Sequence, residues 1–436
     1  MLLCCYLLTL APGVTFWDAG EFIAAAWGFG IPHPPGTPVY VALDHTWTHA
    51  LAPLLGAARA SNVLSAVATA SAGAMSAWLV ANERGAVGGD RSAMSRHGWT
   101  GATAALCAGL MASAWANATE TEVYAIALLH AALMLACAAR AGDAPADRAG
   151  RWTLLTAYAM LLAPAVHLSV LLAAPAAVAL AARDRAGRWN VSRLVALLGV
   201  LVMAAGIGRV SGWIVLTGLL VSAASLVARS ETGDAREPVT RGSVVLLLGA
   251  LVLAGVAASA LLILLVRARL DPPLNQGNPS TLRALGDVVA RRQYDVAPLW
   301  PRRAPAWLQL ANVFQYVDWQ VALGWANGVF TSPARVAATV VFALLGVVGA
   351  RSLRRDARRL ADALLVLLAC GTIGAAVYLN MRAGASLGWN LLPGADAHEA
   401  RERDYFFVYG FWAWGCLAGC GAVALVRSRG WPAPSA

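Results

Sequence analysis

The chain of 436 residues contains no lysine and few charged residues of any kind. All 33 basic residues are arginine, and charged residues make up 13% of the sequence. Soluble domains usually carry about 25% charged residues. With 59% hydrophobic residues, the chain has too few polar side chains to cover a water-soluble globule, so the composition argues against a soluble protein.

The sequence also lacks a cysteine framework. Its seven cysteines lie inside apolar runs, without a second Cys or a His at metal-site spacing across a loop. We interpret them as small buried hydrophobic side chains, which excludes a disulfide scaffold or a zinc module. A signal sequence with a basic start is missing too. Residues 1–11 are apolar but short of the roughly 20 residues of a spanning helix, so we expect an incomplete first helix or a start upstream.

Long apolar runs fill most of the chain. They are about 17 to 25 residues long, as bilayer-spanning helices require, and are separated by short breaks that carry Arg, Pro or Gly. The mean hydropathy of +0.62 agrees. We predict an all-α transmembrane bundle of about 12 spans, a single integral membrane domain over residues 1–436. Residues 154–181 are predicted as two spans that meet near Pro164 to His167.

The arginines predict the orientation of this bundle. Three polar segments stand out, residues 12–56, 267–332 and 381–404. If residues 12–56 lie outside, the segments on the opposite side hold 20 of the 33 arginines. The positive-inside rule then makes that side cytoplasmic, so the three polar segments are predicted to be extracytoplasmic. Topology and lipid contact account for the net charge of +10, and we expect no nucleic-acid partner.

The most unusual polar residues are two acids in TFWDAGEFIAAAWGFGIPHPPGTP, residues 15–38. Asp18 and Glu21 are three residues apart, so a helix would place both on one face, with Cβ atoms about 5–6 Å apart. A carboxylate with the ordinary Asp pKa of about 3.9 can accept a proton at neutral pH. We predict Asp18 and Glu21 as catalytic acids. The alternative is a helix start that the two acids stabilise.

A proline-rich loop follows the two acids. Pro32, Pro34, Pro35 and Pro38 restrict the backbone around His33, which we predict to bind phosphate or sugar, or to hydrogen-bond the turn. Further on, His45 and His49 are spaced for a shared metal. They lack another ligand at helical spacing, so a solvated helix face is preferred. The sequence indicates no metal site and leaves a divalent ion open.

Other candidate residues for substrate binding precede or interrupt apolar runs. Glu120 and Glu122 stand at an expected helix start, where they either complement the helix dipole or line a substrate pocket. His167 lies between two half-length apolar runs, where ionisable groups usually face the bundle interior. A histidine satisfied within the core is the alternative for this position.

Three polar motifs of the second half supply the remaining candidates. DPPLNQGNPST (residues 271–281) is typical of a defined turn network, and the arginines of ARRQYD (290–295) contact anionic lipid or are solvated. The arginines of HEARERDY (398–405) form a phosphate-binding fork or a salt-bridge cluster with neighbouring acids. The predicted substrate-binding residues of these motifs are Asn275, Arg291, Arg292, Arg401, Arg403, Asp404 and Tyr405.

The motifs of this chain resemble, in their order along the sequence, a family of bacterial multispanning proteins of unknown function that is related to eukaryotic protein O-mannosyltransferases. These motifs are TFWDAGEF with HPPGTP, TETEVYA, DPPLNQGNPST with RRQY, and RERDYFF. The resemblance covers nearly the whole chain and implies the GT-C class, membrane enzymes that take a sugar from a polyprenyl-phosphate carrier. It implies Asp18 as the catalytic acid, Glu21 as its companion, and Arg401 or Arg403 on the lipid phosphate. Compared with this class, we expect a truncated first helix and no additional soluble domain for acceptor recognition after the last span, so the acceptor is left open.

From the residues and this resemblance we expect an inverting glycosyltransferase of the bacterial inner membrane. It would move a sugar, with mannose as one candidate, from polyprenyl phosphate to a protein or glycan hydroxyl outside the cytoplasm. The leaving phosphate is already a stable anion, so no second acid needs to protonate it, and an arginine would meet its charge. The alternatives are a transporter or flippase of a lipid-linked or small anionic substrate, and a non-catalytic assembly subunit. The sequence does not determine sugar, acceptor, metal dependence or oligomeric state.

Overall fold

The computed structural model describes residues 1–85, 91–225, 241–294, 297–323 and 328–428. Helices make up 75% of the structure, and the described residues form no β-strand beyond isolated bridges. The predicted all-α class is confirmed. Residues 1–11 form one short helix, α1 (Leu2–Leu8).

Seven helices of the described chain are long and apolar enough to cross a membrane. By length and composition they are helices of an integral membrane protein, whereas the figure of about 12 spans stays a prediction. Other expected spans fall on the shorter apolar helices Leu168–Ala181 and Gly212–Ala224, or on α8 (Ala146–Val166), which begins with charged residues. The seven candidates are Ala57–Glu83, Val123–Asp143, Val191–Gly208, Leu248–Arg269, Pro333–Asp356, Arg358–Leu379 and Asp404–Ser428.

The chain forms two compact units. The first comprises Met1 and residues 3–72 and 118–294, and the second comprises Leu2 and residues 73–117 and 295–436. Three helices of the described chain contribute residues to both units: α1, α4 (Ala57–Gly85) and α6 (Ala112–Thr119).

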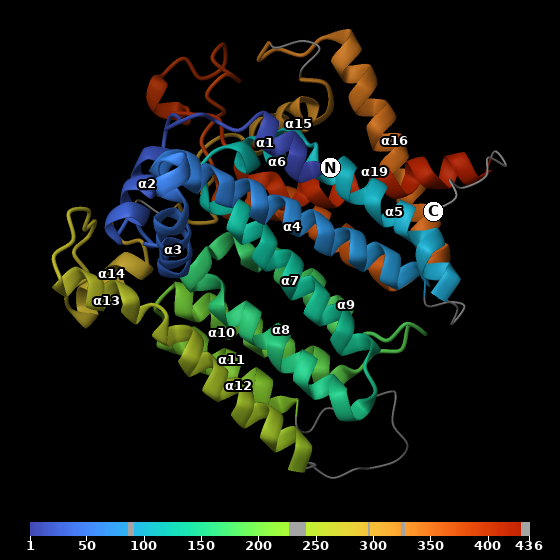
Figure 1. The fold of residues 1–436 in the computed structure, drawn as a ribbon, viewed down its shortest axis with the longest axis horizontal. Coiled ribbons are helices and arrows are strands. Elements are labelled where there is room, and N and C mark those ends of the chain that lie inside the picture. Colours follow the sequence, from blue (N-terminus) through green and yellow to red (C-terminus); the bar gives the residue numbers. More distant parts are fainter. Residues whose placement is uncertain (86–90, 226–240, 295–296, 324–327, 429–436) are drawn as a thin grey trace. The chain divides into compact units, whose positions relative to one another are not determined.

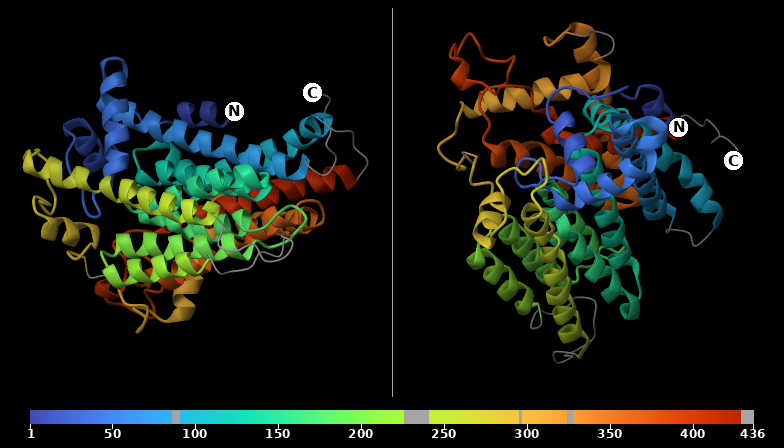
Figure 2. Two further views of the ribbon diagram at one scale, coloured as in Figure 1. Left: turned by 90° about the horizontal axis from the view of Figure 1, so that it is seen from below. Right: turned by 60° about the vertical axis from the view of Figure 1, so that its left-hand side comes forward.

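A helical bundle makes up most of the first unit. Helix α8 packs against α7, α10 and α12, and α10 packs against α11; Figure 1 labels these neighbours, and both views of Figure 2 keep the green helices together. Small residues let α10 and α11 approach closely, because a Cβ on Gly199 would lie 2.3 Å from Ser222 Oγ. The helices are α7 (Val123–Asp143), α8, α9 (Ala174–Ala181), α10 (Val191–Gly208), α11 (Gly212–Ala224) and α12 (Arg241–Ser259).

Helix α8 ends where the sequence predicts a break. Pro164 cannot donate a backbone hydrogen bond to the preceding turn, the helix ends at Val166, and His167 is extended, with φ −170° and ψ 134°. The chain continues as the 3-10 helix η1 (Leu168–Ala173). The predicted break near Pro164 to His167 is therefore present, whereas the interpretation of residues 154–181 as two membrane spans stays a prediction.

Four shorter helices position the acidic stretch of the first unit: α2 (Ala19–Gly28), α3 (Pro38–Leu55), α13 (Leu262–Arg269) and α14 (Leu282–Val289). Helix α2 packs on α3, and α13 on α14. Ile31 is fully buried among apolar residues of α13 and α14. Its N–H donates to Leu274 O at 2.7 Å, and its carbonyl oxygen accepts from Gln276 N at 3.0 Å. This pairing brings the 271–281 turn beside the proline-rich loop.

The second unit is built around the last helix, α19 (Val408–Ser428), which packs against α5, α16 and α17. Glycines allow a close approach, because a Cβ on Gly421 would lie 1.9 Å from Leu345 O. Glu83 and Arg359 form a buried ion pair, with Arg359 Nη2 2.5 Å from Glu83 Oε1. The other helices are α5 (Arg91–Gly109), α15 (Ala306–Ala322), α16 (Pro333–Asp356), α17 (Arg358–Ala369) and α18 (Ala375–Leu379).

Candidate functional site

Asp18 and Glu21 stand at the beginning of α2. Asp18 precedes the first helical residue and makes no side-chain cap hydrogen bond, and Glu21 lies in the first turn. A carboxylate oxygen of each acid and a ring nitrogen of His33 all lie within 4.8 Å of one another. The predicted spacing thus brings both acids to one place, and the loop adds His33 to them.

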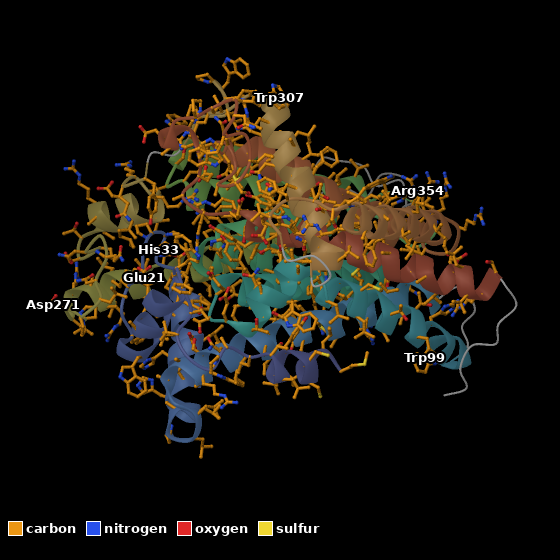
Figure 3. All side chains as sticks on the ribbon, turned by 90° about the horizontal axis from the view of Figure 1, so that it is seen from above. Glu21, His33, Trp99, Asp271, Trp307 and Arg354 are labelled. Atoms are coloured by element: carbon orange, nitrogen blue, oxygen red, sulfur yellow. The ribbon has the colours of Figure 1, made fainter. Side chains whose placement is uncertain are left out.

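Glu21 is held by three hydrogen bonds. Its Oε1 accepts from the His33 backbone N–H and from Gln276 Nε2, each at 2.6 Å, and its Oε2 lies 2.6 Å from His33 Nδ1; Figure 3 shows Glu21 and His33 as neighbours. Burial raises the pKa of Glu21, but the hydrogen bonds and charge of His33, together with the Gln276 amide, lower it below its ordinary value. Glu21 is therefore an ionised carboxylate that anchors the loop.

Gln276 was not singled out by the sequence analysis. It is 255 positions from Glu21 in the chain, and it reaches the acid because residues 274–276 pair with Ile31. The available signal was its place inside DPPLNQGNPST, beside the predicted residue Asn275. Asp18, Glu21, His33 and Gln276 are called the acid site below.

Three further polar side chains interact electrostatically within this unit. Desolvation, and then the charges of Arg291 and His33, lower the pKa of His167 to about 3. Burial raises the pKa of Tyr294, with the charges of Glu21 and Asp18 adding to the increase and Arg291 opposing it. Arg291 and His167 were predicted, whereas Tyr294 was missed although it belongs to the ARRQYD motif. The ring of His167 also meets that of Tyr124 edge-on, with centroids 4.9 Å apart.

Asn275 and Arg292 have local partners. The Asn275 side-chain amide donates to Asn278 Oδ1 at 3.3 Å and approaches Ala268 O at 3.5 Å, within the turn. Arg292 Nη1 donates to Asp287 Oδ1 at 2.7 Å on an exposed surface. The predicted turn network is confirmed, and substrate contact by either residue stays a prediction.

The remaining acids and histidines of the first unit lie around other elements. Glu120 and Glu122 are partly buried, and Glu122 occupies the cap position of α7 without a side-chain cap hydrogen bond. His45 Nδ1 lies 2.7 Å from Ala26 O, and His49 Nδ1 lies 2.9 Å from His45 O. These contacts engage one nitrogen of each ring, and the interpretation of His45 and His49 as a solvated helix face stays a prediction.

The predicted residues of HEARERDY belong to the second unit, at the start of α19. Arg403 Nε lies 3.2 Å from Glu399 Oε2, and Arg403 Nη1 donates to Tyr405 Oη at 2.6 Å. Arg401 lies over the Tyr405 ring, 4.8 Å from its centroid. Asp404 accepts a short hydrogen bond from Ser113 Oγ. Of the two alternatives for this motif, the salt-bridge cluster matches these contacts, and phosphate recognition stays a prediction.

Asp18, Glu21 and His33 are also the residues with the geometry to hold a metal ion. Among the described residues they are the group of His, Cys, Asp and Glu side chains whose ligand atoms converge. Two carboxylates and one imidazole are common ligands of divalent transition metals. The arrangement can therefore accept a proton, bind a cation, or do both with different oxygens.

Residues 18–190 match a family model described as "Protein O-mannosyl-transferase TMEM260 N-terminal domain". The match begins at Asp18 and contains Glu21, His33 and His167, whereas Gln276 and Arg291 lie beyond it. It relates the chain to protein O-mannosyltransferases, which are glycosyltransferases. Comparison with curated proteins and with solved structures gave no match.

Proposed function

We propose that this protein is a membrane glycosyltransferase of the GT-C type, moving a sugar from a polyprenyl-phosphate carrier to an acceptor hydroxyl with inversion at the anomeric carbon. The convergence of Asp18, Glu21 and His33 at the start of α2 is the observation that carries the proposal. The O-mannosyltransferase family match begins at the first of these residues. Mannose on a protein acceptor is the version of the reaction closest to that family.

Asp18 is the base of the proposed reaction. The Glu21 oxygens already face three hydrogen-bonding groups of His33 and Gln276, so proton uptake by Glu21 would disrupt the loop. A base in reach of the acceptor typically contributes about 10²- to 10⁴-fold to the rate. We assign proton transfer to Asp18 and positioning of the loop to Glu21.

The proposed transfer reaction needs no second acid to protonate the leaving group. The acceptor oxygen gives its proton to Asp18 and forms a bond to the anomeric carbon. The bond from that carbon to the phosphate oxygen breaks, and its electron pair stays on the phosphate as a polyprenyl phosphate monoester. Cationic groups stabilise this developing charge. Arg291 is our candidate, because its charge acts on His167 and Tyr294, and the charges of both acids also act on Tyr294.

A lipid-linked donor fits a site outside the cytoplasm, where nucleotide sugars are absent. We therefore place residues 12–56, 267–332 and 381–404 on the extracytoplasmic side of a bacterial inner membrane. Reporter fusions after residues 30, 188 and 390 test this orientation. An extracytoplasmic signal at 30 and 390 with a cytoplasmic signal at 188 is expected, and a cytoplasmic signal at 30 would overturn the proposed site.

Sugar transfer by purified protein tests the function. The protein is reconstituted in vesicles with radiolabelled polyprenyl-phosphate mannose and acceptor peptides rich in Ser and Thr. Labelled peptide is expected with the unmodified chain and not with Asp18→Asn. If Asp18→Asn transfers sugar as fast as the unmodified chain, Asp18 is not the base.

A transporter of an anionic lipid-linked substrate is the second candidate. The break of α8 at His167 favours it, because interrupted helices with polar groups also line transport pathways. The same vesicles separate the two functions. Movement of intact donor across the bilayer without labelled peptide would support the transporter, and labelled peptide supports the enzyme.

A further inference from the structure

We propose that Asp18, Glu21 and His33 bind a divalent cation of the Mn²⁺ type. Their ligand atoms, one from each residue, lie within 4.8 Å of one another. Two carboxylates and an imidazole form a mixed oxygen and nitrogen set, which suits Mn²⁺ or Zn²⁺ better than the all-oxygen sets typical of Ca²⁺ and Mg²⁺. The proposed cation binding is argued from this geometry, whereas the role of the ion in transfer rests on the proposed function.

The three ligands are held in place before an ion binds. Asp18 and Glu21 belong to one helix start, and His33 stands in a loop whose flexibility four prolines restrict. Ile31 ties this loop to Leu274 and Gln276 through backbone hydrogen bonds. A cation therefore meets a prepared set of ligands and need not order the loop.

One pair of atoms in the site suggests how the cation would be held. Glu21 Oε2 and His33 Nδ1 are 2.6 Å apart, close enough to share a proton or to bind the same ion. The other Glu21 oxygen stays engaged by the His33 backbone and by Gln276. Gln276 thus acts as an outer partner that orients a ligand, a role whose loss commonly weakens metal affinity about 10- to 100-fold.

Charge balance gives a second reason for a cation, one that rests on the proposed function. The donor of the proposed function carries an anionic phosphate, and negative charges at close range repel each other more strongly at a protein surface than in bulk water. Of the neighbouring arginines, Arg267 contacts Phe29 O and Gly28 O, Arg269 contacts Ser280 O, and Arg292 contacts Asp287, which leaves Arg291 as the one cationic side chain assigned to the phosphate in the proposed function. A divalent ion between the acids and the phosphate would remove the repulsion and stabilise the leaving group.

Mn²⁺ binding by the full chain in detergent tests the proposal directly. The purified protein is treated with EDTA, passed over a desalting column and titrated with Mn²⁺, while electron paramagnetic resonance measures the free ion. One bound Mn²⁺ per chain is expected for the unmodified protein. Asp18→Asn and His33→Gln should each weaken binding by more than about tenfold, and Gln276→Leu by about tenfold.

Asp362→Asn is the matched control, because this acid is part of longer ion pairs at 3.6 and 3.9 Å in the second unit. The Asp362→Asn variant should bind Mn²⁺ with the same affinity as the unmodified chain. Should His33→Gln fail to fold, Asp18→Asn decides, since Asp18 is not one of the groups that hold Glu21. Absence of bound Mn²⁺, or equal affinity in Asp18→Asn and the unmodified chain, would overturn the cation site.

Sugar transfer by the same samples separates this proposal from the proposed function. Transfer that stops after EDTA and returns with Mn²⁺ supports both. Mn²⁺ binding that requires Asp18, without any transfer, keeps the cation site and refutes the glycosyltransferase. Full transfer by metal-stripped protein that binds no Mn²⁺ keeps the enzyme and refutes the cation site.

Discussion

The acid site of the first unit and the polar residues before α19 in the second unit use similar side chains in opposite ways. Before α19, Glu402 accepts from Tyr316 Oη at 2.8 Å and from Ser386 Oγ at 2.5 Å. Glu399 accepts from Arg403, and Asp404 accepts from Ser113. At the acid site, two carboxylates instead converge on one imidazole. We call the residues before α19 the α19 network: Ser113, Tyr316, Ser386, Glu399, Glu402, Arg403 and Asp404.

This difference in hydrogen-bond partners helps to distinguish acids that stabilise the fold from acids that take part in a reaction. An acid that accepts hydrogen bonds from hydroxyl groups or a guanidinium is satisfied, and it fixes the chain around it. At the acid site Glu21 is satisfied in the same way, but a second carboxylate and an imidazole converge beside it, an arrangement typical of sites that bind cations or move protons. We therefore expect the α19 network to act as a structural support and regard the acid site as the better candidate for the reaction.

The largest expected effect is the loss of transfer in Asp18→Asn. The amide cannot accept the acceptor proton at neutral pH, so the rate should fall by about 10²- to 10⁴-fold. Expression and melting temperature in detergent should stay close to those of the unmodified chain. Transfer is measured as labelled peptide per folded protein, with Asp362→Asn as the control that retains activity. A similar loss in both variants would mean that the effect does not depend on the place of Asp18 in the acid site.

The next largest effect is expected at the buried pair of Glu83 and Arg359. Both side chains are 2% exposed, so Arg359→Met leaves a buried carboxylate without its guanidinium, at a cost of about 3–5 kcal/mol in unfolding free energy. Thermal unfolding in detergent measures the loss. The double variant Glu83→Gln with Arg359→Met should recover part of the stability. If the single variant melts like the unmodified chain, the pair is not a support of the second unit.

Tyr316→Phe tests the α19 network itself. The variant removes the donor to Glu402 and the acceptor of the Arg403 N–H, which is 2.9 Å from Tyr316 Oη. Loss of partners for buried polar groups costs about 1–3 kcal/mol. A lower melting temperature with unchanged transfer per folded molecule is expected. Transfer that falls more than the folded fraction would assign this network to the reaction.

The smallest effect is a change of pH dependence in His167→Gln. The folded-state pKa of His167 is about 3, below the ordinary value of about 6.5, so between these values only the unfolded chain takes up this proton. His167 thus makes stability rise with pH across that window, and its contribution is lost as the pH falls. Melting temperatures at pH 6.5 and 4.5 should differ less in His167→Gln than in the unmodified chain. An equal or larger difference would contradict the low pKa.

Much of the fold follows from local sequence. Apolar runs predict membrane helices because each run must bury its own backbone hydrogen bonds within the bilayer. Pro164 predicts the end of α8 because proline cannot donate the helical hydrogen bond. The number of spans is harder to predict, because runs such as residues 212–224 form helices shorter than the other candidates. Apolarity alone does not decide where such a helix ends.

The acid site was predictable only in part. Asp18, Glu21 and His33 lie within 16 residues of one another, so helix spacing and prolines indicate that they stay close. Gln276 and Tyr294 could not be identified in this way, since their approach depends on Ile31 pairing with residues 274–276. For Arg403, the sequence left two alternatives open because Glu399 and Tyr405 are neighbours on either side, and only side-chain positions show that both contact it.

The sequence by itself determined that the chain is helical and apolar, that it breaks at Pro164 to His167, and that two acids share one helix start. These properties depend on neighbouring residues, whose interactions have fixed spacing. Only the tertiary structure decided that Gln276 and His33 hold Glu21, and that the acids before α19 are paired with hydroxyl groups and arginine. Such contacts join residues far apart in the chain or choose among several near neighbours, and they form only when the folded backbone brings the side chains together.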